Sequence, residues 1–397
     1  MLKVDIMLIK NSQDEVKKRE SSFKIIKSIL NEKGRRDLYD LTGLSGGFIA
    51  SENDLNLLET YVGPAIFEEE LETLGKEHLG GEKVLAVNRT SSGILATILS
   101  LVCENSYIIH YLPEFPAHPS ITRSAKLIGA NYIEFDNLDD FHIPENTSLI
   151  IITGSTMDHK VIDEDIFKEV INRAKMRKIP VFVDDASGAR LRTILFNQKK
   201  AIDLGADLVV TSTDKLMFGP RGGLMAGKKE LINKIKSKAH QFGLEAQPPS
   251  ILAMVNGLKS FNGENIKNSI EKKQELINLL NNKSSGTLGN VFEETPTGVM
   301  ISEESLKNEL KSHRLLDNIS SKDCCFLLAM NLLKNEGIIT IPAVSMPGAS
   351  PTIRFDLSSH DCEKLKMETL ADKIFNSFNS FLEIVNDYDK SEELLFS

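Results

Sequence analysis

The chain has few cysteines, no long apolar stretch and no excess of positive charge, and each absence excludes a class of protein. Its four cysteines in 397 residues lack metal-ligand spacing and form no disulfide framework, so we expect a cytoplasmic protein without a metal site. The longest uncharged apolar stretch, residues 90–103, is too short to span a bilayer. A net charge of −9 argues against a general nucleic-acid-binding surface.

The remaining composition is that of a globular protein, with 26% charged and 41% hydrophobic residues. Strand-like apolar runs alternate with helical patterns up to about residue 227, which predicts a mainly parallel sheet covered by helices on both faces. We therefore expect an α/β fold in three parts. These are an N-terminal helical segment (1–40), a large α/β domain (41–260) and a smaller α+β domain (261–397).

Two short apolar runs in the large domain end in polar residues. Residues 181–183 and 208–210 are rich in β-branched side chains and look like buried parallel strands. Asp184 follows the first run, and Thr-Ser-Thr-Asp leads from the second run to Lys215. Because open α/β sheets bind ligands at the carboxyl ends of their strands, we expect Asp184 and Lys215 to share a site.

A carboxylate and a lysine placed in this way suit pyridoxal 5′-phosphate, which needs an amine for its aldehyde and an acid for its ring nitrogen. Asp184 would keep the ring nitrogen protonated, while Lys215 would form the Schiff base and later transfer protons. Ser212 would donate a hydrogen bond to the phosphate, and Ser187 could reach the ring hydroxyl. The alternative is that Asp184 only caps a strand and that Lys215 is a surface lysine, and either residue alone would favour it. The two residues together, in this order and with Ser212, favour a site for pyridoxal phosphate.

A serine-rich loop upstream offers a site for the phosphate group. A strand at residues 84–87 leads into Ser91, Ser92 and Gly93, where a helix begins. The first amides of a helix lack intrahelical partners and favour an anion, so we assign the phosphate to these three residues. The alternative is that Thr90 or Ser91 simply caps the helix.

Asp184, together with the run from Ser212 to Leu216 and the following Gly-Pro-Arg-Gly-Gly, resembles the aspartate aminotransferase superfamily, fold type I of the pyridoxal phosphate enzymes. Within that superfamily, the run resembles bacterial selenocysteine synthase (L-seryl-tRNA(Sec) selenium transferase) and, more closely, its archaeal pyridoxal phosphate-dependent relatives. The resemblance extends over about residues 40–381. It implies a homodimer with a shared active site.

The resemblance also implies two further site residues. Enzymes of fold type I usually stack an aromatic or histidine ring on the cofactor, and His118 is our choice for this role, with Phe115 and His110 as rivals. An ordinary loop histidine is the alternative. Arg354 resembles the arginine that binds a substrate carboxylate through two parallel hydrogen bonds, and a surface salt bridge is its alternative.

The resemblance favours a lyase or transferase that performs β-elimination or β-replacement on a small amino acid similar to serine, phosphoserine or cysteine. A second hypothesis is selenocysteine synthesis on an aminoacyl-tRNA, disfavoured by the short N-terminal segment and the acidic balance. A third is a non-catalytic scaffold that binds pyridoxal phosphate. The pair Cys324 and Cys325 could suggest a cysteine desulfurase, but it begins an apolar helical run, so we expect two core cysteines.

Overall fold

The structure is a computed structural model that describes residues 7–396 except 45, 56, 285–290, 314 and 316–318. The chain forms two compact units. Unit 1 consists of Met1–Gly43 and Asn265–Ser397, and unit 2 is the continuous stretch Leu44–Glu264. The N-terminal segment therefore belongs to the same unit as the C-terminal part of the chain. No helix in the described ranges is long and apolar enough to cross a membrane.

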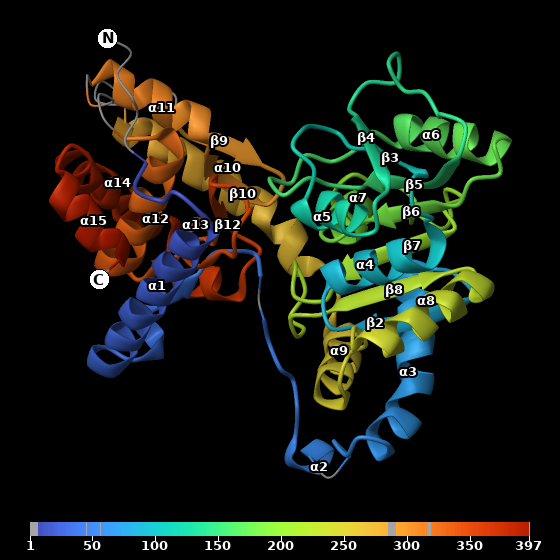
Figure 1. Cartoon of the computed structure of the whole chain (residues 1–397). Coiled ribbons are helices and arrows are strands. Elements are labelled where there is room, and N and C mark those ends of the chain that lie inside the picture. Colours follow the sequence, from blue (N-terminus) through green and yellow to red (C-terminus); the bar gives the residue numbers. More distant parts are fainter. Residues whose placement is uncertain are drawn as a thin grey trace. The chain divides into compact units, whose positions relative to one another are not determined.

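A seven-stranded sheet forms the centre of unit 2, with the strand order β2-β8-β7-β6-β5-β3-β4 (Figure 1). Its strands are β2 (Lys83–Val87), β3 (Tyr107–Tyr111), β4 (Asn131–Phe135), β5 (Thr147–Thr153), β6 (Val181–Asp184), β7 (Leu208–Ser212) and β8 (Gly223–Gly227). Only β8 among them runs antiparallel to its neighbours β2 and β7. The other pairings are parallel, so the mainly parallel sheet expected from the sequence is confirmed.

Helices cover both faces of this sheet. One face packs on α3 (Val62–Leu79), α6 (Glu164–Met176) and α9 (Pro248–Ser260), and the other on α4 (Thr90–Leu101), α5 (Pro119–Leu127) and α8 (Lys229–Phe242). Two shorter helices complete the unit, α2 (Glu52–Leu55) and α7 (Gly188–Leu195). Because both faces are buried, the central strands consist of continuous apolar residues rather than an alternating pattern.

Unit 1 combines helices with two small sheets. Its elements are α1 (Ser12–Glu32), η1 (Arg35–Asp37), β1 (Tyr39–Asp40), α10 (Glu264–Ser284), β9 (Glu293–Thr295), β10 (Gly298–Ile301), α11 (Glu303–Ser312), α12 (Ser321–Glu336), β11 (Ile338–Ile339), α13 (Ile341–Val344), β12 (Ile353–Asp356), η2 (His360–Lys364), α14 (Met367–Ile384) and α15 (Tyr388–Phe396). Strand β1 pairs with β11 in parallel, and β10 lies between β9 and β12 in an antiparallel sheet.

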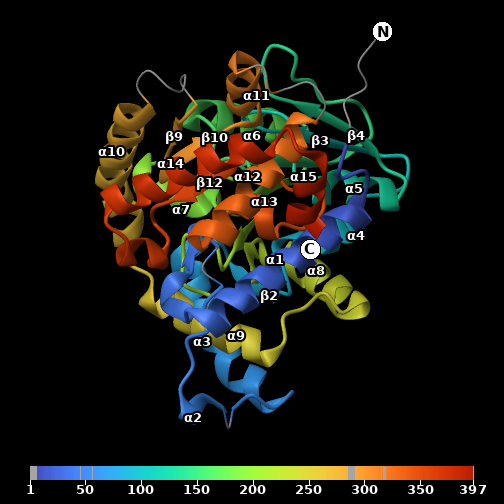
Figure 2. The same cartoon turned by 90° about the vertical axis from the view of Figure 1, so that its left-hand side faces the viewer.

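Helix α12 is the core element of unit 1. It contacts α1, α11, α13, α14 and α15, and Figure 2 shows it among these helices. Ser320 caps its first turn by accepting a hydrogen bond from the amide of Asp323, and Gly337 ends it in a left-handed conformation. Cys324 and Cys325 are fully buried in its first turns, which confirms that they are core cysteines.

Candidate functional site

The carboxyl ends of β6 and β7 bring Asp184 and Ser212 of the predicted site together, and β5 ends beside them. Thr153 on β5 pairs in register with Asp184 on β6, and Asp184 pairs with Val210 on β7. Neighbouring strands lie about 4.8 Å apart, and residues paired in register point to the same face. Ser212 comes two residues after Val210, so its side chain points to the same face as that of Asp184.

Asp184 is buried, and its environment disfavours the charged form. Burial raises the pKa of this carboxyl group to about 6, and neighbouring Asp185 adds to the rise, whereas Lys215 and the amide of Ala186 act in the opposite direction. Within the described part of the chain, the Oδ1 atom of Asp184 has no hydrogen-bond partner. A buried carboxylate oxygen of this kind fits a cationic N–H donor, such as the protonated ring nitrogen of pyridoxal phosphate.

Lys215 lies in the loop between β7 and β8, and several hydrogen bonds hold that loop. The Ser212 hydroxyl donates to Oδ1 of Asp214 at 2.6 Å, and the Thr213 hydroxyl donates to the carbonyl of Pro220 at 2.7 Å. The sequence predicts that Ser212 donates to the phosphate. In the structure its hydroxyl binds a carboxylate two residues away, so its phosphate role requires this proton to change partners.

Arg190 is a residue of the site that the sequence analysis missed. It is fully buried in α7, and its Nη1 donates to the carbonyl oxygens of Ser212 at 2.7 Å and of Lys215 at 2.9 Å. Burial lowers the pKa of the guanidinium to about 10, while Asp214 and Asp185 act against that shift. Arg190 thus connects the end of β7 with the backbone of Lys215 in the loop that follows. The sequence signal was present, because an arginine closes the Ser-Gly-Ala-Arg run just after Asp184.

The predicted phosphate residues lie at the start of α4, close to the same loop. Strand β8 begins at Gly223, which pairs with Ser212 on one side and Val87 on the other. A side chain at Gly223 would meet the backbone of Arg89 at 2.7 Å, so the start of α4 packs directly against this point. The chain thereby brings the first turn of α4 next to the end of β7.

The first turn of α4 is only partly available to an anion. Its N-cap residue, Arg89, makes no side-chain capping bond, because a guanidinium has no acceptor for the helix amides. The amides of Ser92 and Gly93, however, donate to the carbonyl of Arg89 at 2.9 and 3.2 Å. Gly93 also has a packing role, since a Cβ atom there would lie 2.8 Å from the sulfur of Met225.

His118 caps the start of α5, where its Nδ1 accepts from the amide of Ser120 at 3.2 Å. Part of the residue reaches solvent, and three cations lie near its ring. Loss of hydration lowers the pKa of His118 to about 4, and the positive charges of Lys215, Arg89 and Arg123 add to this. The structure therefore brings the imidazole near Lys215, and its stacking on the cofactor stays a prediction.

The two rivals of His118 occupy different surroundings. Phe115 is exposed on the loop before α5. His110 is fully buried on β3, where its ring nitrogens bind the hydroxyl groups of Tyr132 and Thr153. The hydrogen bonds of His110 thus make it part of the sheet interior.

Ser187 and Arg354 lie in different units. Ser187 is buried at the start of α7 and shares a 2.7 Å hydrogen bond with the hydroxyl of Ser155, near the end of β5. Arg354 belongs to β12 of unit 1, where its guanidinium donates to the carbonyl of Thr42 at 3.4 Å and lies 4.0 Å from Asp356. Its role toward a substrate bound at Lys215 remains a prediction.

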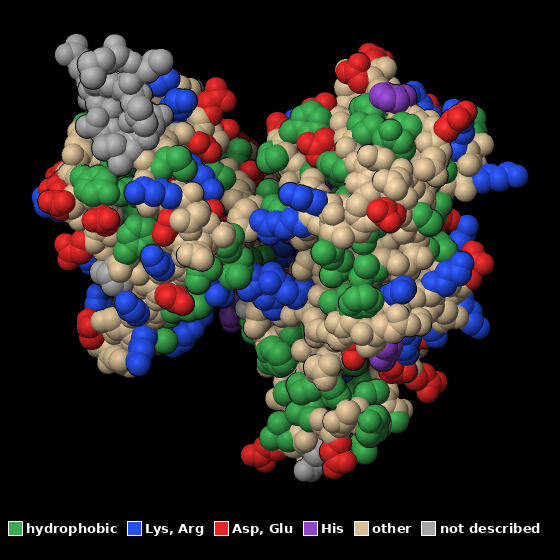
Figure 3. Space-filling view, viewed as in Figure 1, with side chains coloured by type: hydrophobic (Ala, Val, Ile, Leu, Met, Phe, Trp, Pro, Cys, Tyr) green, Lys and Arg blue, Asp and Glu red, His purple; other side chains and the backbone are tan. Residues whose placement is uncertain are grey.

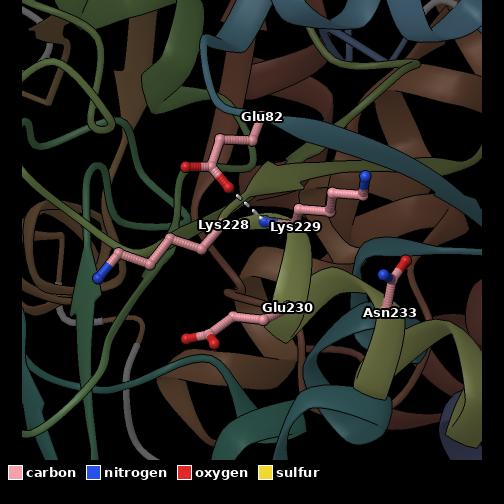
Figure 4. Close-up of a pocket in the computed structure, with 5 residues that line it drawn as sticks. All are labelled: Glu82, Lys228, Lys229, Glu230 and Asn233. Atoms are coloured by element: carbon pink, nitrogen blue, oxygen red, sulfur yellow. Dashed lines mark hydrogen bonds between the residues drawn. The ribbon is translucent and has the colours of Figure 1, made fainter.

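A surface recess of about 560 Å³ lies elsewhere in unit 2 and carries no such arrangement. Its lining side chains at the start of α8 point in different directions, and the amide of Lys229 donates to Glu82 (Figure 4). Because β8 is antiparallel to β7, Lys228 lies at the opposite edge of the sheet from Asp184 and Ser212. We assign no chemistry to this recess.

The chain is similar to several families of known proteins. The profile of the L-seryl-tRNA selenium transferase family matches residues 141–286, and that of the UPF0425 C-terminal domain matches residues 288–366. A UPF0425 pyridoxal phosphate-dependent protein of Methanothermobacter thermautotrophicus is 49% identical over 98% of this chain and 100% of that protein. The L-seryl-tRNA(Sec) selenium transferase of Clostridium perfringens is 28% identical over 51% of this chain and 47% of that protein.

Two solved structures have a similar fold. A structure of the complex between SepCysS and the N-terminal domain of SepCysE matches with a TM-score of 0.56 at 15% identity, over 90% of this chain and 98% of that chain. Serine palmitoyltransferase of Sphingomonas wittichii matches with a TM-score of 0.57 at 16% identity, over 95% of this chain and 88% of that chain. The fold expected from the sequence is thereby confirmed. Pyridoxal phosphate is the cofactor, and the chain belongs to the family of UPF0425 pyridoxal phosphate-dependent proteins.

Proposed function

We propose that this protein is an enzyme that uses pyridoxal phosphate for β-elimination or β-replacement on a small amino acid similar to serine, phosphoserine or cysteine. Bound at this site, the cofactor supplies an electron sink that allows a bond at the substrate Cα to break. The observation that carries the proposal is the buried, unpartnered Oδ1 of Asp184, on a strand next to the one that leads to Lys215. A cationic N–H donor would stabilise the ionised form of this carboxyl group, and the protonated ring nitrogen of the cofactor would be such a donor.

The residues of the site have separate tasks in this proposal. Asp184 holds a proton on the ring nitrogen, and Lys215 supplies the amine that binds the cofactor and then moves a proton at the substrate Cα. The first turn of α4, with Ser91 and Ser92, binds the phosphate. His118 covers the ring, and Arg354 binds the substrate carboxylate.

The proposed reaction has a product that can be measured directly. In β-elimination, serine loses water or phosphoserine loses phosphate, and water then hydrolyses the released enamine to pyruvate and ammonia. Purified protein with cofactor should therefore release pyruvate from either amino acid. Lys215→Ala should abolish the release because it removes the amine. Lys234→Ala, an exposed lysine on α8, is the matched control and should leave it unchanged. If no candidate amino acid is consumed, with or without an added thiol as replacing nucleophile, the proposed reaction class is wrong.

A second candidate is a transferase acting on an aminoacyl-tRNA. It is favoured by the match of residues 141–286 to the L-seryl-tRNA selenium transferase family. Adding seryl-tRNA in place of free serine separates the two candidates. Turnover that needs the tRNA supports the second candidate, and turnover of free amino acid supports the first.

We further propose that the protein acts as a homodimer with a shared active site. Unit 2 carries a group of exposed apolar side chains on α2 and the start of α3, visible in Figure 3, which includes Leu55, Tyr61, Val62 and Ile66. Tyr61 is 88% exposed, which is unusual for so large a side chain unless a partner covers it. Light scattering of the wild type and of Ile66→Glu tests the assembly: a monomer in both would contradict it.

The cysteine content of the chain supports a location in the cytoplasm. Cys324, Cys325 and Cys362 are buried thiols, and Cys103 is exposed and unpaired with any of them. Such thiols persist where the compartment is reducing.

A further inference from the structure

Four polar side chains form a continuous hydrogen-bonded chain across one face of the sheet in unit 2. Tyr132 on β4 donates its hydroxyl proton to Oε2 of Glu134 at 2.6 Å, and its oxygen lies 2.7 Å from Nδ1 of His110 on β3. The other ring nitrogen of His110, Nε2, lies 2.8 Å from the hydroxyl of Thr153 on β5. The chain therefore runs from Glu134 to the strand end that carries Thr153.

The direction of each proton in this chain follows from chemistry. The Tyr132 hydroxyl donates its proton to Oε2 of Glu134, and the raised pKa of Tyr132, caused mainly by burial, keeps that proton in place. Complete burial lowers the pKa of His110 to about 3, so the ring is neutral and carries one N–H. That hydrogen must be on Nδ1, because the Tyr132 oxygen has no proton left to donate. Nε2 is then an acceptor, and Thr153 donates to it.

Thr153 is thereby left with oxygen lone pairs only. It pairs in register with Asp184, so the two side chains lie on neighbouring strands and point to the same face. The same face carries His110, which pairs with Ile151, two residues before Thr153. A group that forms a hydrogen bond to the Thr153 oxygen from the open end of the strands must therefore donate it, and the ionised form of Asp184 likewise only accepts.

We propose that Glu134, Tyr132 and His110 form a relay that fixes Thr153 as a hydrogen-bond acceptor, and that Thr153 and Asp184 together hold the protonated ring nitrogen of pyridoxal phosphate. The proposal rests on the assignment of Asp184 to the ring nitrogen made above. Thr153 touches the cofactor, whereas the three relay residues are positioning residues that act through it.

The charged groups around Thr153 and Asp184 explain why a second hydrogen-bond acceptor would help to bind the ring nitrogen. Asp184 faces the positive charge of Lys215 and the negative charge of Asp185, and Asp185 is in turn held by Arg192 through Nε at 3.1 Å. The carboxylate of Asp184 is costly to ionise in this buried place. An oriented neutral acceptor beside it strengthens the binding of a cationic N–H without adding a second buried charge.

The relay can be tested in the cofactor-free protein by ¹⁵N NMR of the histidine rings. We expect His110 to show the tautomer with hydrogen on Nδ1 and to lose this fixed tautomer in Tyr132→Phe. Tyr107→Phe removes a tyrosine hydroxyl from the same strand as His110 and is the matched control, with no expected change. Hydrogen on Nε2 in the wild type would overturn the relay, because Thr153 could then be an acceptor toward His110 and a donor toward the cofactor.

The contact with the cofactor is tested by its affinity and by the ¹⁵N signal of its labelled ring nitrogen. Thr153→Val and Tyr132→Phe should each weaken binding about tenfold and move the ring nitrogen toward its neutral signal, as loss of one hydrogen bond to a charged group implies. Thr153→Ser keeps the hydroxyl and should restore both values. Unchanged affinity and signal in Thr153→Val would overturn the role of Thr153.

Failure of the proposal and failure of the Asp184 assignment give different results. If Asp184→Asn leaves the ring nitrogen signal unchanged, Asp184 does not hold that nitrogen and the proposed pair is wrong as well. The tautomer of His110 is measured without cofactor and still decides whether the relay exists. A wild-type signal in Asp184→Asn together with an altered signal in Thr153→Val would place the ring nitrogen at Thr153 alone.

Discussion

Replacing Asp184 by asparagine should remove a large pH dependence from the stability of the cofactor-free protein. Burial raises the pKa of Asp184 to about 6 from an ordinary value of 3.8, and its Oδ1 has no hydrogen-bond partner among the described residues. The folded protein thus holds the proton of this group more tightly than the unfolded chain does. Asparagine has a similar shape and stays neutral at every pH.

The sign and size of the effect follow from this difference. Because the native pKa is raised, the stabilisation from the bound proton is complete below about pH 4 and is lost as the pH rises to about 6. A difference of about two pKa units corresponds to about 3 kcal/mol in the free energy of unfolding. The wild type should therefore lose about 3 kcal/mol more than Asp184→Asn between pH 4 and pH 7.

Urea unfolding of both proteins without cofactor, followed by circular dichroism at several pH values, measures this difference. Asp165→Asn changes an exposed carboxylate on α6 and should follow the wild-type curve. Saturating pyridoxal phosphate should flatten the wild-type curve, because a cation on Asp184 stabilises its ionised form. Parallel curves for the wild type and Asp184→Asn without cofactor would refute the view that Asp184 is a strained buried carboxylate.

Three further substitutions test other parts of the site. Arg190→Met removes the guanidinium bonds to the backbone of the lysine loop and should lower the free energy of unfolding, measured with urea, by about 3–5 kcal/mol. Its control is Arg173→Met, at a partly exposed arginine that also donates to two backbone carbonyls. This change should lower the free energy of unfolding by about 1 kcal/mol. Gly93→Ala places a Cβ atom 2.8 Å from the sulfur of Met225 and should destabilise the protein by about 1–3 kcal/mol. It should also weaken cofactor binding, which calorimetry measures. Unchanged stability and affinity would show that α4 can move away from the sheet. Arg354→Lys should raise the KM for the amino acid about tenfold with little change in stability, because lysine cannot make two parallel hydrogen bonds to a carboxylate, and an unchanged KM would contradict that role.

The sheet of unit 2 could be predicted largely from sequence because its strands are buried on both faces. The apolar runs at 181–183 and 208–210 correspond to β6 and β7, each extended by polar residues at its carboxyl end. Strand β8 offered no comparable signal, since it begins at Gly223 and ends at Gly227 and has only three apolar residues between them. Its antiparallel direction depends on pairing with β2, which is distant in sequence.

The boundaries in unit 1 were less accessible to sequence reasoning. The apolar run at residues 338–341 has the pattern of a short strand, but β11 ends at Ile339. Helix α13 begins at Ile341 with Pro342 in its first turn, where proline favours a helix start because its missing N–H is not needed there. The local pattern of apolar residues cannot distinguish these two cases.

Within the site, residue types were predictable and hydrogen-bond partners were not. Asp184 and Lys215 could be proposed because two neighbouring strands lead to residues of the types that one cofactor requires. The bond from Ser212 to Asp214 and the bonds from Arg190 to the lysine loop depend on side-chain directions that no sequence pattern reports. The same holds for His110, whose partners Tyr132 and Thr153 come from two different strands.

The most direct test of the central claim is to locate the lysine that binds the cofactor. Protein incubated with pyridoxal phosphate is reduced with borohydride, digested and mapped by peptide mass spectrometry, for the wild type and for Asp184→Asn. We expect the pyridoxyl group on Lys215 in the wild type, accompanied by a visible absorbance band before reduction that Lys215→Ala lacks. A pyridoxyl group found only on other lysines, or a band that persists in Lys215→Ala, would contradict the account.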